Sequence, residues 1–385
     1  MNRLRMLTAG ESHGLQLTAI LDGCPSGLEL GGDAVDQELA RRQKGFGRGA
    51  RQQIESDRVA IVAGVRYGTT TGAPIALTVG NRDAGSWGDI LSVEAGAGPA
   101  KPIRVPRPGH ADLGGHLTYE LDDLRDVMER ASARETAAKV ACGAVAKALL
   151  RVIGCSVVSH VVAIGGVEAR SEATPELLQG VDTDPVRCLD PAASKDMCDA
   201  IVNAGQRGDT LGGVFEVIAY GFPPGVGSYV QGDRRLGAIL AAAAMSVPAM
   251  KGVEVGLGFA CAALPGSAVH DEILIDEHGD YRRATNRAGG IEGGISTGEP
   301  IVLRIAMKPI ATLLEPLASV DLDSGLPTAA HVERSDVCAV PAAAVVGEAV
   351  VALALADAAL ERFGGQTVRE FTEAIAAFRR RIKRR

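Results

Sequence analysis

Long runs of small apolar residues govern how this chain can pack. Four Ala-rich stretches are predicted to be helices, at 33–42, 132–152, 233–245 and 341–363. Aromatic residues make up only 3% of the 385-residue sequence, whereas 48 residues are Gly. The core must therefore be built mainly from Ala, Val, Leu and Ile, with backbones that approach closely at Gly and Ala. Such close and extensive contacts also make an oligomer plausible.

The predicted strands do not alternate regularly with these helices. Runs of β-branched residues predict strands at 58–65, 157–164, 214–220 and 301–307. Weaker helical patterns cover 194–203 and 368–381. Because the order lacks the βαβ rhythm of a doubly wound sheet, we expect an α+β fold in which antiparallel sheets sandwich central Ala- and Gly-rich helices. We expect residues 1–385 to form one large domain.

Charge and cysteine usage exclude several classes of protein. The net charge of −7 argues against a general nucleic-acid binder. The seven cysteines are scattered without a C-x-x-C pair, which favours reduced thiols in a cytoplasmic protein and neither a metal site nor a disulfide framework. No apolar segment follows Arg3 and Arg5, so a secretory signal is not expected. The apolar stretch 339–360 carries Glu348 and Asp357, which favours a buried helix over a membrane span.

Helix starts are natural anion sites because their first N–H groups lack partners within the helix. Ser132 and Glu135 have the spacing of a capping box, which predicts a helix start at Ser132. Pro341 suits the first turn of another helix, and Asp233 suits the N-cap of a third. Arginines flank the first two of these starts, so both are candidate binding sites for anions.

A run of cations between positions 41 and 51 contains no acidic residue. Its members are Arg41, Arg42, Lys44, Arg48 and Arg51, and three glycines interrupt them. Arginine is suited to two-pronged binding of phosphate, and glycine permits tight turns. A solvated basic loop is the alternative interpretation. An RNA-binding loop is less favoured because only Phe46 could stack on a base.

A second cationic segment, 101–110, ends in His110. Lys101, Arg104 and Arg107 lie in it, and its prolines favour an extended loop that would aim Arg107 and His110 in a constant direction. A solvent-exposed histidine is the alternative. The segment 308–312 follows a predicted strand, and the Gly-rich segment 289–294 precedes it; a structural turn is the simpler explanation of the latter.

These features together predict an enzyme for a small ligand with several negative charges. No P-loop, dinucleotide-binding glycine pattern, metal-ligand cluster or G-x-S-x-G nucleophile motif occurs in the sequence. In Gly10-Glu-Ser-His-Gly14 the Ser lies directly beside His13 and not between variable residues. From the residues alone, the reaction stays open.

Seven segments, in order along the chain, resemble those of chorismate synthases. Three carry the principal motifs: Gly10-Glu-Ser-His-Gly14, Glu129-Arg-Ala-Ser-Ala-Arg-Glu-Thr136 and Arg334-Ser-Asp-Val-Cys338. The others are the segments 41–49, 107–112, 250–254 and 308–312. Lys44 departs from the family, which often has Gly there, and this difference is expected to affect loop mobility more than chemistry.

The resemblance implies a reaction and its cofactors. Members of the family eliminate phosphate from 5-enolpyruvylshikimate-3-phosphate in a 1,4-trans sense to give chorismate, in the shikimate pathway. They require reduced FMN although the reaction has no net redox change, and some use NADPH to reduce it. The family fold is an α+β sandwich, and the usual assembly is a homotetramer. A substrate with one phosphate and two carboxylates would account for the many arginines.

The resemblance also implies roles for individual residues. His13 would protonate the departing phosphate, His110 would protonate or support the reduced flavin, and Asp336 would assist proton removal. Substrate anions would be held by Arg51, Arg107, Arg134 and Arg334. The FMN-binding positions would be Arg130, Ala131, Ser132, Pro248, Ala249, Gly293, Lys308, Pro309, Ile310, Ala311, Thr312 and Arg334. Arg42 and Arg48 match positions assigned to NADPH or the supply of reduced flavin.

Two other classes of function make different demands. A polyanion- or RNA-binding module using the loop 41–51 would bind oligonucleotides with a steep salt dependence. A flavin reductase would oxidise NADPH without any shikimate ester. Release of phosphate from the substrate under anaerobic conditions separates both from a chorismate synthase.

Overall fold

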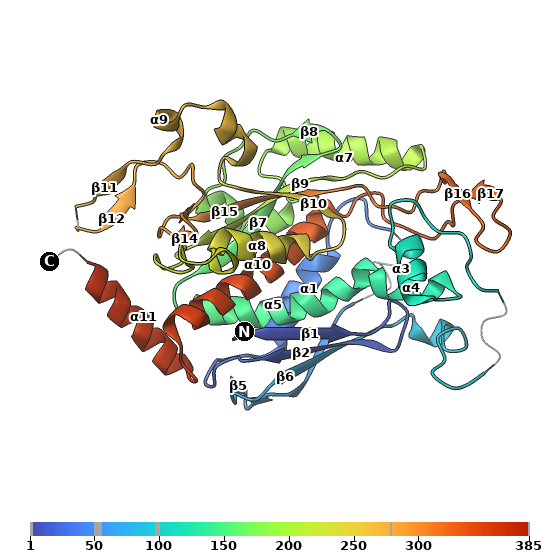
Figure 1. Ribbon diagram of the computed structural model, residues 1–385, viewed down its shortest axis with the longest axis horizontal. Coiled ribbons are helices and arrows are strands. Elements are labelled where there is room, and N and C mark those ends of the chain that lie inside the picture. Colours follow the sequence, from blue (N-terminus) through green and yellow to red (C-terminus); the bar gives the residue numbers. More distant parts are fainter. Residues whose placement is uncertain (1–2, 50–55, 97–100, 278, 384–385) are drawn as a thin grey trace.

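The computed structural model describes residues 3–49, 56–96, 101–277 and 279–383, and it has two antiparallel sheets with helices between them (Figure 1). The first sheet has the strand order β1-β2-β6-β3, with bounds Arg5–Ala9, Gln16–Asp22, Ile75–Gly80 and Val59–Ala63. The second has the order β10-β15-β9-β7-β8, with bounds Met250–Val255, Ile301–Met307, Gly213–Tyr220, Ser156–Ile164 and Val167–Glu168. The expected α+β sandwich is therefore confirmed.

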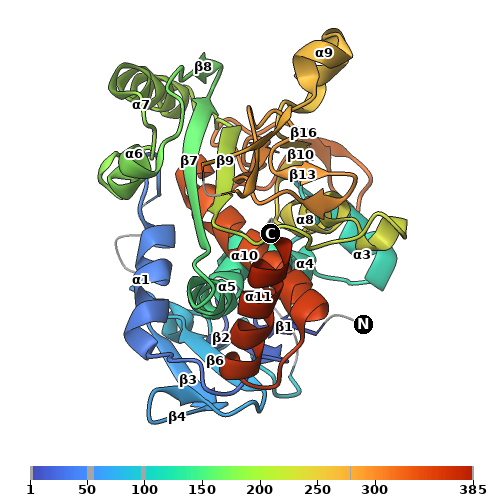
Figure 2. The ribbon, with the colours of Figure 1, turned by 90° about the vertical axis from the view of Figure 1, so that its left-hand side faces the viewer.

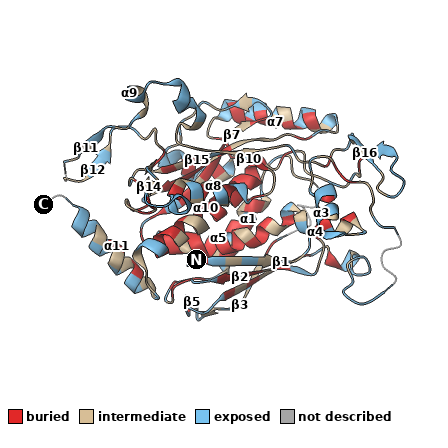
Figure 3. Cartoon of the chain, viewed as in Figure 1, coloured by how far each residue is buried: buried red, intermediate tan, exposed pale blue. Residues whose placement is uncertain are grey.

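Two helices fill the space between the sheets. Helix α5 (Thr136–Arg151) packs on β2 and β6 of the first sheet, and α10 (Val340–Phe363) packs on β7 and β9 of the second. The two helices also pack on each other, and α1 (Gly32–Gln43) and α8 (Leu236–Met245) lie against them (Figure 2). Both central helices are buried along most of their length, as Figure 3 shows. The prediction of Ala-rich helices buried on more than one side is thus confirmed.

Close approach of the two central helices depends on glycine. A Cβ atom added to Gly143 of α5 would lie 2.3 Å from the Cβ of Ala349 on α10. On the opposite side of α10, a Cβ added to Gly347 would lie 2.6 Å from the Phe215 ring of the second sheet. Because protein interiors are packed as densely as organic crystals, neither position can accept a side chain without displacing its neighbour.

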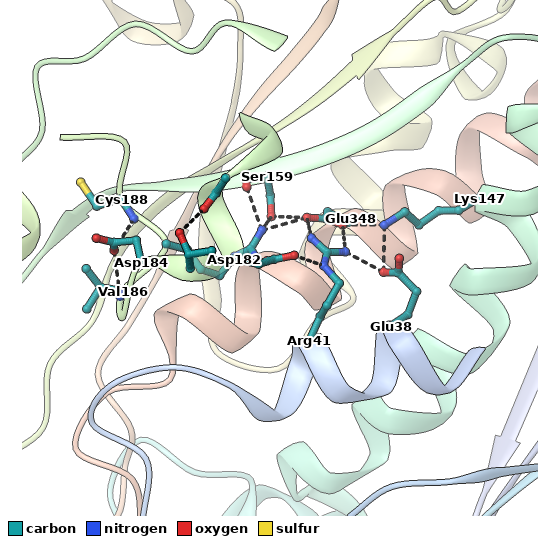
Figure 4. A network of polar contacts seen from close by, with 12 residues as sticks. Glu38, Arg41, Lys147, Ser159, Asp182, Asp184, Val186, Cys188 and Glu348 are labelled. Atoms are coloured by element: carbon teal, nitrogen blue, oxygen red, sulfur yellow. Dashed lines mark hydrogen bonds and ion pairs between the residues drawn. The ribbon is translucent and has the colours of Figure 1, made fainter. Parts of the chain in front are cut away.

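Helix α10 is the one described helix long and apolar enough to cross a membrane, and 83% of its apolar window is buried inside the protein. It carries Glu348 in its middle, whose side chain is fully buried. Three cations from different elements contact that carboxylate: Arg41 at 2.7 Å, Lys147 at 2.7 Å and Arg187 at 3.1 Å. Figure 4 shows this ionic cluster between α1, α5 and α10. The helix therefore belongs to the core, as the sequence predicted.

The remaining helices lie around this sandwich. Helices α6 (Pro175–Gln179) and α7 (Pro191–Gln206) contact β7, while α11 (Val368–Ile382) packs against α10. The short helices α3 (Asp112–Tyr119) and α4 (Leu124–Ala131) pack on each other near the start of α5. A four-residue helix, α9 (Gly266–Val269), and the hairpin of β11 (Ile273–Ile275) and β12 (Tyr281–Arg283) project at one end (Figure 1).

The other strands are short and form pairs outside the two main sheets. Two pairs have strands of two residues: β4 (Val65–Arg66) with β5 (Thr69–Thr70), and β13 (Ile291–Glu292) with β14 (Ile295–Ser296). The three-residue strands β16 (Ala318–Val320) and β17 (Pro327–Ala329) form a further hairpin.

Two predicted helix caps differ from the structure. Asp233 lies in a 3₁₀ turn, and α8 begins three residues later, at Leu236 with Arg235 as its N-cap. Ser132 is an N-cap, but its hydroxyl accepts from the N–H of Arg134, and Glu135 accepts from the Thr8 hydroxyl at 3.1 Å instead of closing a capping box. Pro341 lies in the first turn of α10, so that prediction is confirmed.

Candidate active site

His13 lies in the turn between β1 and β2 and is held by a buried carboxylate. Gly10 has a φ of 111°, and a Cβ there would lie 2.5 Å from the carbonyl oxygen of Gln16, so the turn requires glycine. The backbone N–H of His13 donates to Glu129 Oε2 at 2.8 Å, and Nδ1 lies 2.8 Å from Oε1 of the same carboxylate. Since an ionised carboxylate only accepts, this contact places a proton on Nδ1 and directs proton exchange with a ligand to Nε2.

Arg134 and Arg42 meet beside the start of α5. Arg134 is buried, and its guanidinium donates to Asp57 at 2.7 Å, to Asn81 at 2.8 Å and to the Gly80 carbonyl at 3.2 Å. Arg42 is also buried, and it donates to the Ala133 carbonyl at 2.9 Å and to the Thr136 hydroxyl at 3.0 Å. The contacts of both guanidiniums therefore stabilise the start of α5, in addition to any contact that they make with a ligand.

Burial lowers the pKa of Arg42 from its usual value, and the positive charges of Arg48 and Arg134 add to this shift. The carboxylates of Asp57 and Asp336 oppose this shift, and an anion bound among the three guanidiniums would add to their effect. Ser132, at the N-cap beside them, donates its hydroxyl to Ser12 at 3.0 Å, one residue before His13. The anion site predicted at this helix start thus lies next to the predicted acid.

The glycine-rich loop that follows α1 reaches the segment before α10. Asp336 Oδ1 accepts from the N–H of Gly49 at 2.6 Å, and Asp336 Oδ2 lies 3.2 Å from Arg48. The loop passes so close that a Cβ on Gly47 would lie 3.2 Å from the backbone nitrogen of Cys338. Arg48 and Asp336, which were predicted as site residues from distant parts of the sequence, are therefore paired in the structure. Arg51 lies outside the described residues.

The prediction that 41–51 is a phosphate-binding run is wrong for Arg41. Its guanidinium binds Glu38, Glu348 and Asp182 at 2.6 to 2.7 Å, inside the ionic cluster of Figure 4. Burial favours these partners because an unpaired charge in the interior is costly. No local pattern in the sequence indicates this pairing, since Glu348 is 307 residues from Arg41.

His110 lies at the end of the second cationic segment, on the Asp112 carboxylate. Its Nδ1 is 2.5 Å from Asp112 Oδ1, while Arg107 donates to Oδ2 at 2.8 Å and lies 3.0 Å from the same Nδ1. Burial alone would raise the pKa of Asp112, but the hydrogen bonds from His110 and Arg107 outweigh it and hold the pKa well below its usual range. The ionised Asp112 therefore offsets the crowding of the two donors and fixes the His110 ring.

The segment 308–312 packs against this histidine loop. The Thr312 hydroxyl accepts from Arg107 at 2.9 Å, and the Lys308 ammonium donates to the Gly109 carbonyl at 2.8 Å. Lys308 also uses its backbone N–H to bind the carbonyl of Ala249 at 3.0 Å, which brings Pro248 and Ala249 to the same place. Burial and the neighbouring Lys251 lower the pKa of Lys308, as expected for a cation that has no acidic partner among the described residues.

An ionic chain joins the surroundings of the two histidines. Glu129, which holds His13, lies 3.6 Å from Arg125, and Arg125 lies 2.7 Å from Glu333. Glu333 in turn lies 3.9 Å from Arg107, the partner of Asp112. Burial would raise the pKa of Glu333, but His331, Arg125 and Arg107 lower it to about 2. His13 and His110 thus belong to one continuous region.

Other predicted site residues lie at the edge of this region. Arg130 is exposed and donates to the Thr8 hydroxyl at 2.8 Å and to the Gly10 carbonyl at 3.2 Å, so it braces the turn that carries His13. Arg334 is exposed, and its side chain makes no hydrogen bond or ion pair with the described residues. Gly293 lies in the turn between β13 and β14 with open space where a Cβ would be, and in the described part of the chain no contact links it to either histidine.

Several residues of this region were not assigned a role by the sequence. Asp112 lies two residues from His110 in the segment 107–112, so its spacing could have indicated it, whereas Glu129 lies in the segment 129–136 and is 116 positions from His13. Asp57, Asn81, Arg125 and Glu333 bind the predicted residues from elsewhere in the chain, and nothing in their local sequence distinguishes them.

Known proteins resemble this chain in sequence and in fold. The chorismate synthase family model matches residues 4–360. Chorismate synthase 2 of Bacillus anthracis is 55% identical over 94% of this chain and 95% of its own length. Chorismate synthase of Geobacillus kaustophilus is 53% identical over 99% of this chain and 100% of its own length. A crystal structure of chorismate synthase, 40% identical, aligns with a TM-score of 0.80 over 99% of this chain and 98% of that chain. A full-length match in sequence and in fold, with the motifs gathered in one region, means that this chain belongs to the chorismate synthase family.

Proposed function

We propose that this chain eliminates phosphate from 5-enolpyruvylshikimate-3-phosphate in a 1,4-trans sense and so forms chorismate, with reduced FMN bound beside the substrate. The observation that carries the proposal is the pairing of two histidines with two carboxylates, His13 with Glu129 and His110 with Asp112, inside one arginine-rich region. General acid–base catalysis at neutral pH is the chemistry that such histidines perform.

His13 is proposed as the acid that protonates the departing phosphate. Glu129 holds Nδ1 and the backbone N–H of this residue, so the tautomer is set and the ring is anchored at Nδ1 before the substrate binds. The arginines at the start of α5 lie close to this turn, because Ser132 binds Ser12. A phosphate placed there would be neutralised by guanidiniums and would meet Nε2 of His13.

Arg107 and Arg134 are proposed to hold substrate anions. Arg107 uses its Nε–H and one Nη2–H on Asp112 and one Nη1–H on Thr312, so the second N–H of Nη1 can still face a ligand. Arg134 is more fully used by Asp57, Asn81 and Gly80. We therefore give Arg134 the smaller share of direct substrate contact and propose that it mainly fixes the start of α5. Arg51 and Arg334 are the further candidates for substrate anions.

The residues proposed for FMN suit a phosphorylated flavin. Beside them lies Arg48, which the resemblance assigns to NADPH or the supply of reduced flavin; its Nε is buried without a hydrogen-bond partner among the described residues, the arrangement expected where a ligand supplies the acceptor. Ala249 has a φ of 70°, a strained backbone that packs against Lys308, and the space at Gly293 is open. With them, the positions 130–132, 308–312 and 334 would hold the cofactor. When bound, reduced FMN would lend an electron to the substrate and regain it, which eases cleavage of the C–O bond to phosphate.

His110 and Asp336 are proposed to act on the flavin side of the site. His110 is fixed by Asp112 and lies beside the segment 308–312, where it would donate a proton to the reduced flavin or stabilise its charge. Asp336 contacts Arg48 and the Gly49 N–H, which hold its carboxylate in place, and it is proposed to accept a proton there.

NADPH is proposed as a possible reductant of the flavin, with Arg48 as its contact. Arg42 supports this role less well because its donors are directed to Ala133 and Thr136 in the interior. We also propose a single domain, since one continuous cluster of buried apolar residues joins both sheets and the central helices. A cytoplasmic homotetramer is the proposed assembly, by analogy with the family.

Anaerobic release of inorganic phosphate tests the function directly. The purified protein, supplied with chemically reduced FMN and the phosphorylated substrate, is expected to release phosphate and form chorismate, whereas oxidised FMN alone should give none. Adding NADPH to oxidised FMN tests whether the protein reduces its own flavin. Absence of phosphate release with reduced FMN would overturn the proposal.

A further inference from the structure

The one tryptophan of the chain, Trp87, stacks on His13. The centroids of the two rings lie 3.9 Å apart, and their planes differ by 20°. Trp87 follows a 3₁₀ turn, Ala84–Ser86, in the segment after β6, and it is half-buried. This segment belongs to none of the motifs on which the catalytic assignments rest. A lone tryptophan in parallel contact with a proposed acid therefore requires a physical explanation.

A second contact fixes the indole itself. The guanidinium carbon of Arg125 lies 5.1 Å from the centroid of the Trp87 ring, within the range of a cation–π interaction. Arg125 cannot shift freely, because it also binds Glu333 at 2.7 Å and lies 3.6 Å from Glu129. Trp87 is thus held by the same helix, α4, whose Glu129 holds His13.

Two contacts of different kinds define the orientation of the imidazole. The Glu129 carboxylate anchors Nδ1 but leaves the ring able to rock about that hydrogen bond. The indole lies along the face of the ring and opposes this motion, because parallel rings lose contact when one of them tilts. Together the two contacts fix the direction in which Nε2 points.

We propose that Trp87 is a positioning residue for the elimination reaction, which holds the His13 ring so that its Nε2 faces the departing phosphate. The inference rests on the proposed role of His13. Among the described residues, the charged groups in contact with this pair include Glu129 and Arg125 of α4, and Arg125 is itself paired with Glu333 of the segment before α10.

Intrinsic fluorescence tests the stack without any activity measurement. A protonated imidazole in contact with an indole quenches its emission, and Trp87 is the chain's one source of tryptophan emission. Emission is expected to rise as pH increases through the titration of His13. The transition should vanish in His13→Asn and persist in the control His116→Asn, whose ring binds the Leu121 carbonyl. Persistence of the transition in His13→Asn would overturn the contact.

Kinetics test the positioning role. Trp87→Ala is expected to lower kcat roughly 10-fold to 100-fold, because small displacements of a catalytic group cost rate on this scale, with little change in KM. Trp87→Phe retains a flat ring and should recover most of the loss. Tyr229→Ala removes an exposed aromatic ring and serves as the matched control. Circular dichroism and thermal unfolding establish that the variants are folded.

The outcomes separate this inference from the proposed function. Wild-type kcat in folded Trp87→Ala, alongside an inactive His13→Asn, would refute the positioning role and leave the function intact. Full turnover in His13→Asn together with loss of its fluorescence transition would refute the role of His13 and leave the stack intact. If Trp87→Ala does not fold, the comparison of Trp87→Phe with Trp87→Leu replaces it, and equal kcat in these two variants counts against positioning.

Discussion

Arg107 and Thr312, which are 205 positions apart in the sequence, share a hydrogen bond of 2.9 Å inside the protein. This bond joins the loop that carries His110 to the segment that follows β15. Both segments were assigned to the site from their sequences, one to the substrate and one to the cofactor. The bond shows that the two segments contact each other directly, so a substitution in one is expected to alter the other.

Replacing Thr312 by Val should therefore weaken both stability and activity. The substitution keeps the shape but leaves a buried Arg107 donor without its acceptor, which costs about 1–3 kcal/mol. Denaturant unfolding should show this loss as a lower midpoint with an unchanged slope. The control Thr71→Val removes an exposed hydroxyl with a 3.3 Å contact and should change stability much less. Equal midpoints for the two variants would mean that the Arg107–Thr312 bond contributes little.

The two histidines should be separable from binding. His13→Ala and His110→Ala are each expected to lower turnover by roughly 10²-fold or more, while FMN and substrate binding stay nearly intact. Single-turnover measurements with reduced FMN, and titration of flavin absorbance in the presence of substrate, give the two quantities. Wild-type turnover in either variant would remove that residue from the proposed chemistry.

Local composition predicted the elements that local physics determines. The range 341–363 became α10, and 157–164 and 301–307 became β7 and β15, because Ala favours helices and β-branched residues favour strands. The strand β2 was not predicted because Gln16–Asp22 mixes polar and apolar residues without a strong β-branched run. The short helix α3, which contains two glycines, was missed for a similar reason.

Partners that come from distant parts of the chain could not be predicted. Arg41 and Arg48 look alike in the sequence, yet Arg41 binds Glu348 in the core and Arg48 binds Asp336 at the site. The choice depends on which carboxylate the fold brings close. The motifs supplied His13, His110 and the nearby Asp112, but the pairing of His13 with Glu129 and the position of Trp87 became visible only in the structure, which places α4 beside the β1–β2 turn.

The crossing of the central helices gives a prediction on packing. Gly143→Ala should destabilise the protein by about 1–3 kcal/mol, because its new Cβ would lie 2.3 Å from that of Ala349. The double variant Gly143→Ala with Ala349→Gly should recover part of the loss, which thermal unfolding can measure. Gly114→Ala in α3 is the matched control: a Cβ there meets open space in the described part of the chain, so stability should stay the same or rise. Lack of any recovery in the double variant would mean that the obstacle is the backbone of Ala349, whose Cα and carbonyl oxygen lie 2.5 and 3.0 Å from the added Cβ, and not its side chain.

The buried Glu348 gives a prediction on pH. Burial by itself would raise the pKa of this carboxyl, but Lys147, Arg41 and Arg187 outweigh it and hold the pKa far below its usual range. A carboxylate with a lowered folded-state pKa contributes stability above its unfolded value of about 4.3 and loses that contribution as pH falls. Glu348→Gln leaves three cations with one fewer anion, so it should lower the free energy of unfolding by about 3–5 kcal/mol at pH 7.

Denaturant unfolding of the wild type and of Glu348→Gln from pH 7 down to pH 3 measures this gap in the free energy of unfolding, which should narrow below about pH 4.3. Glu361→Gln, at an exposed pair with Arg234, is the control and should show almost no gap at any pH. A gap for Glu348→Gln that stays constant with pH would mean that the ionised carboxylate is not the source of the stability.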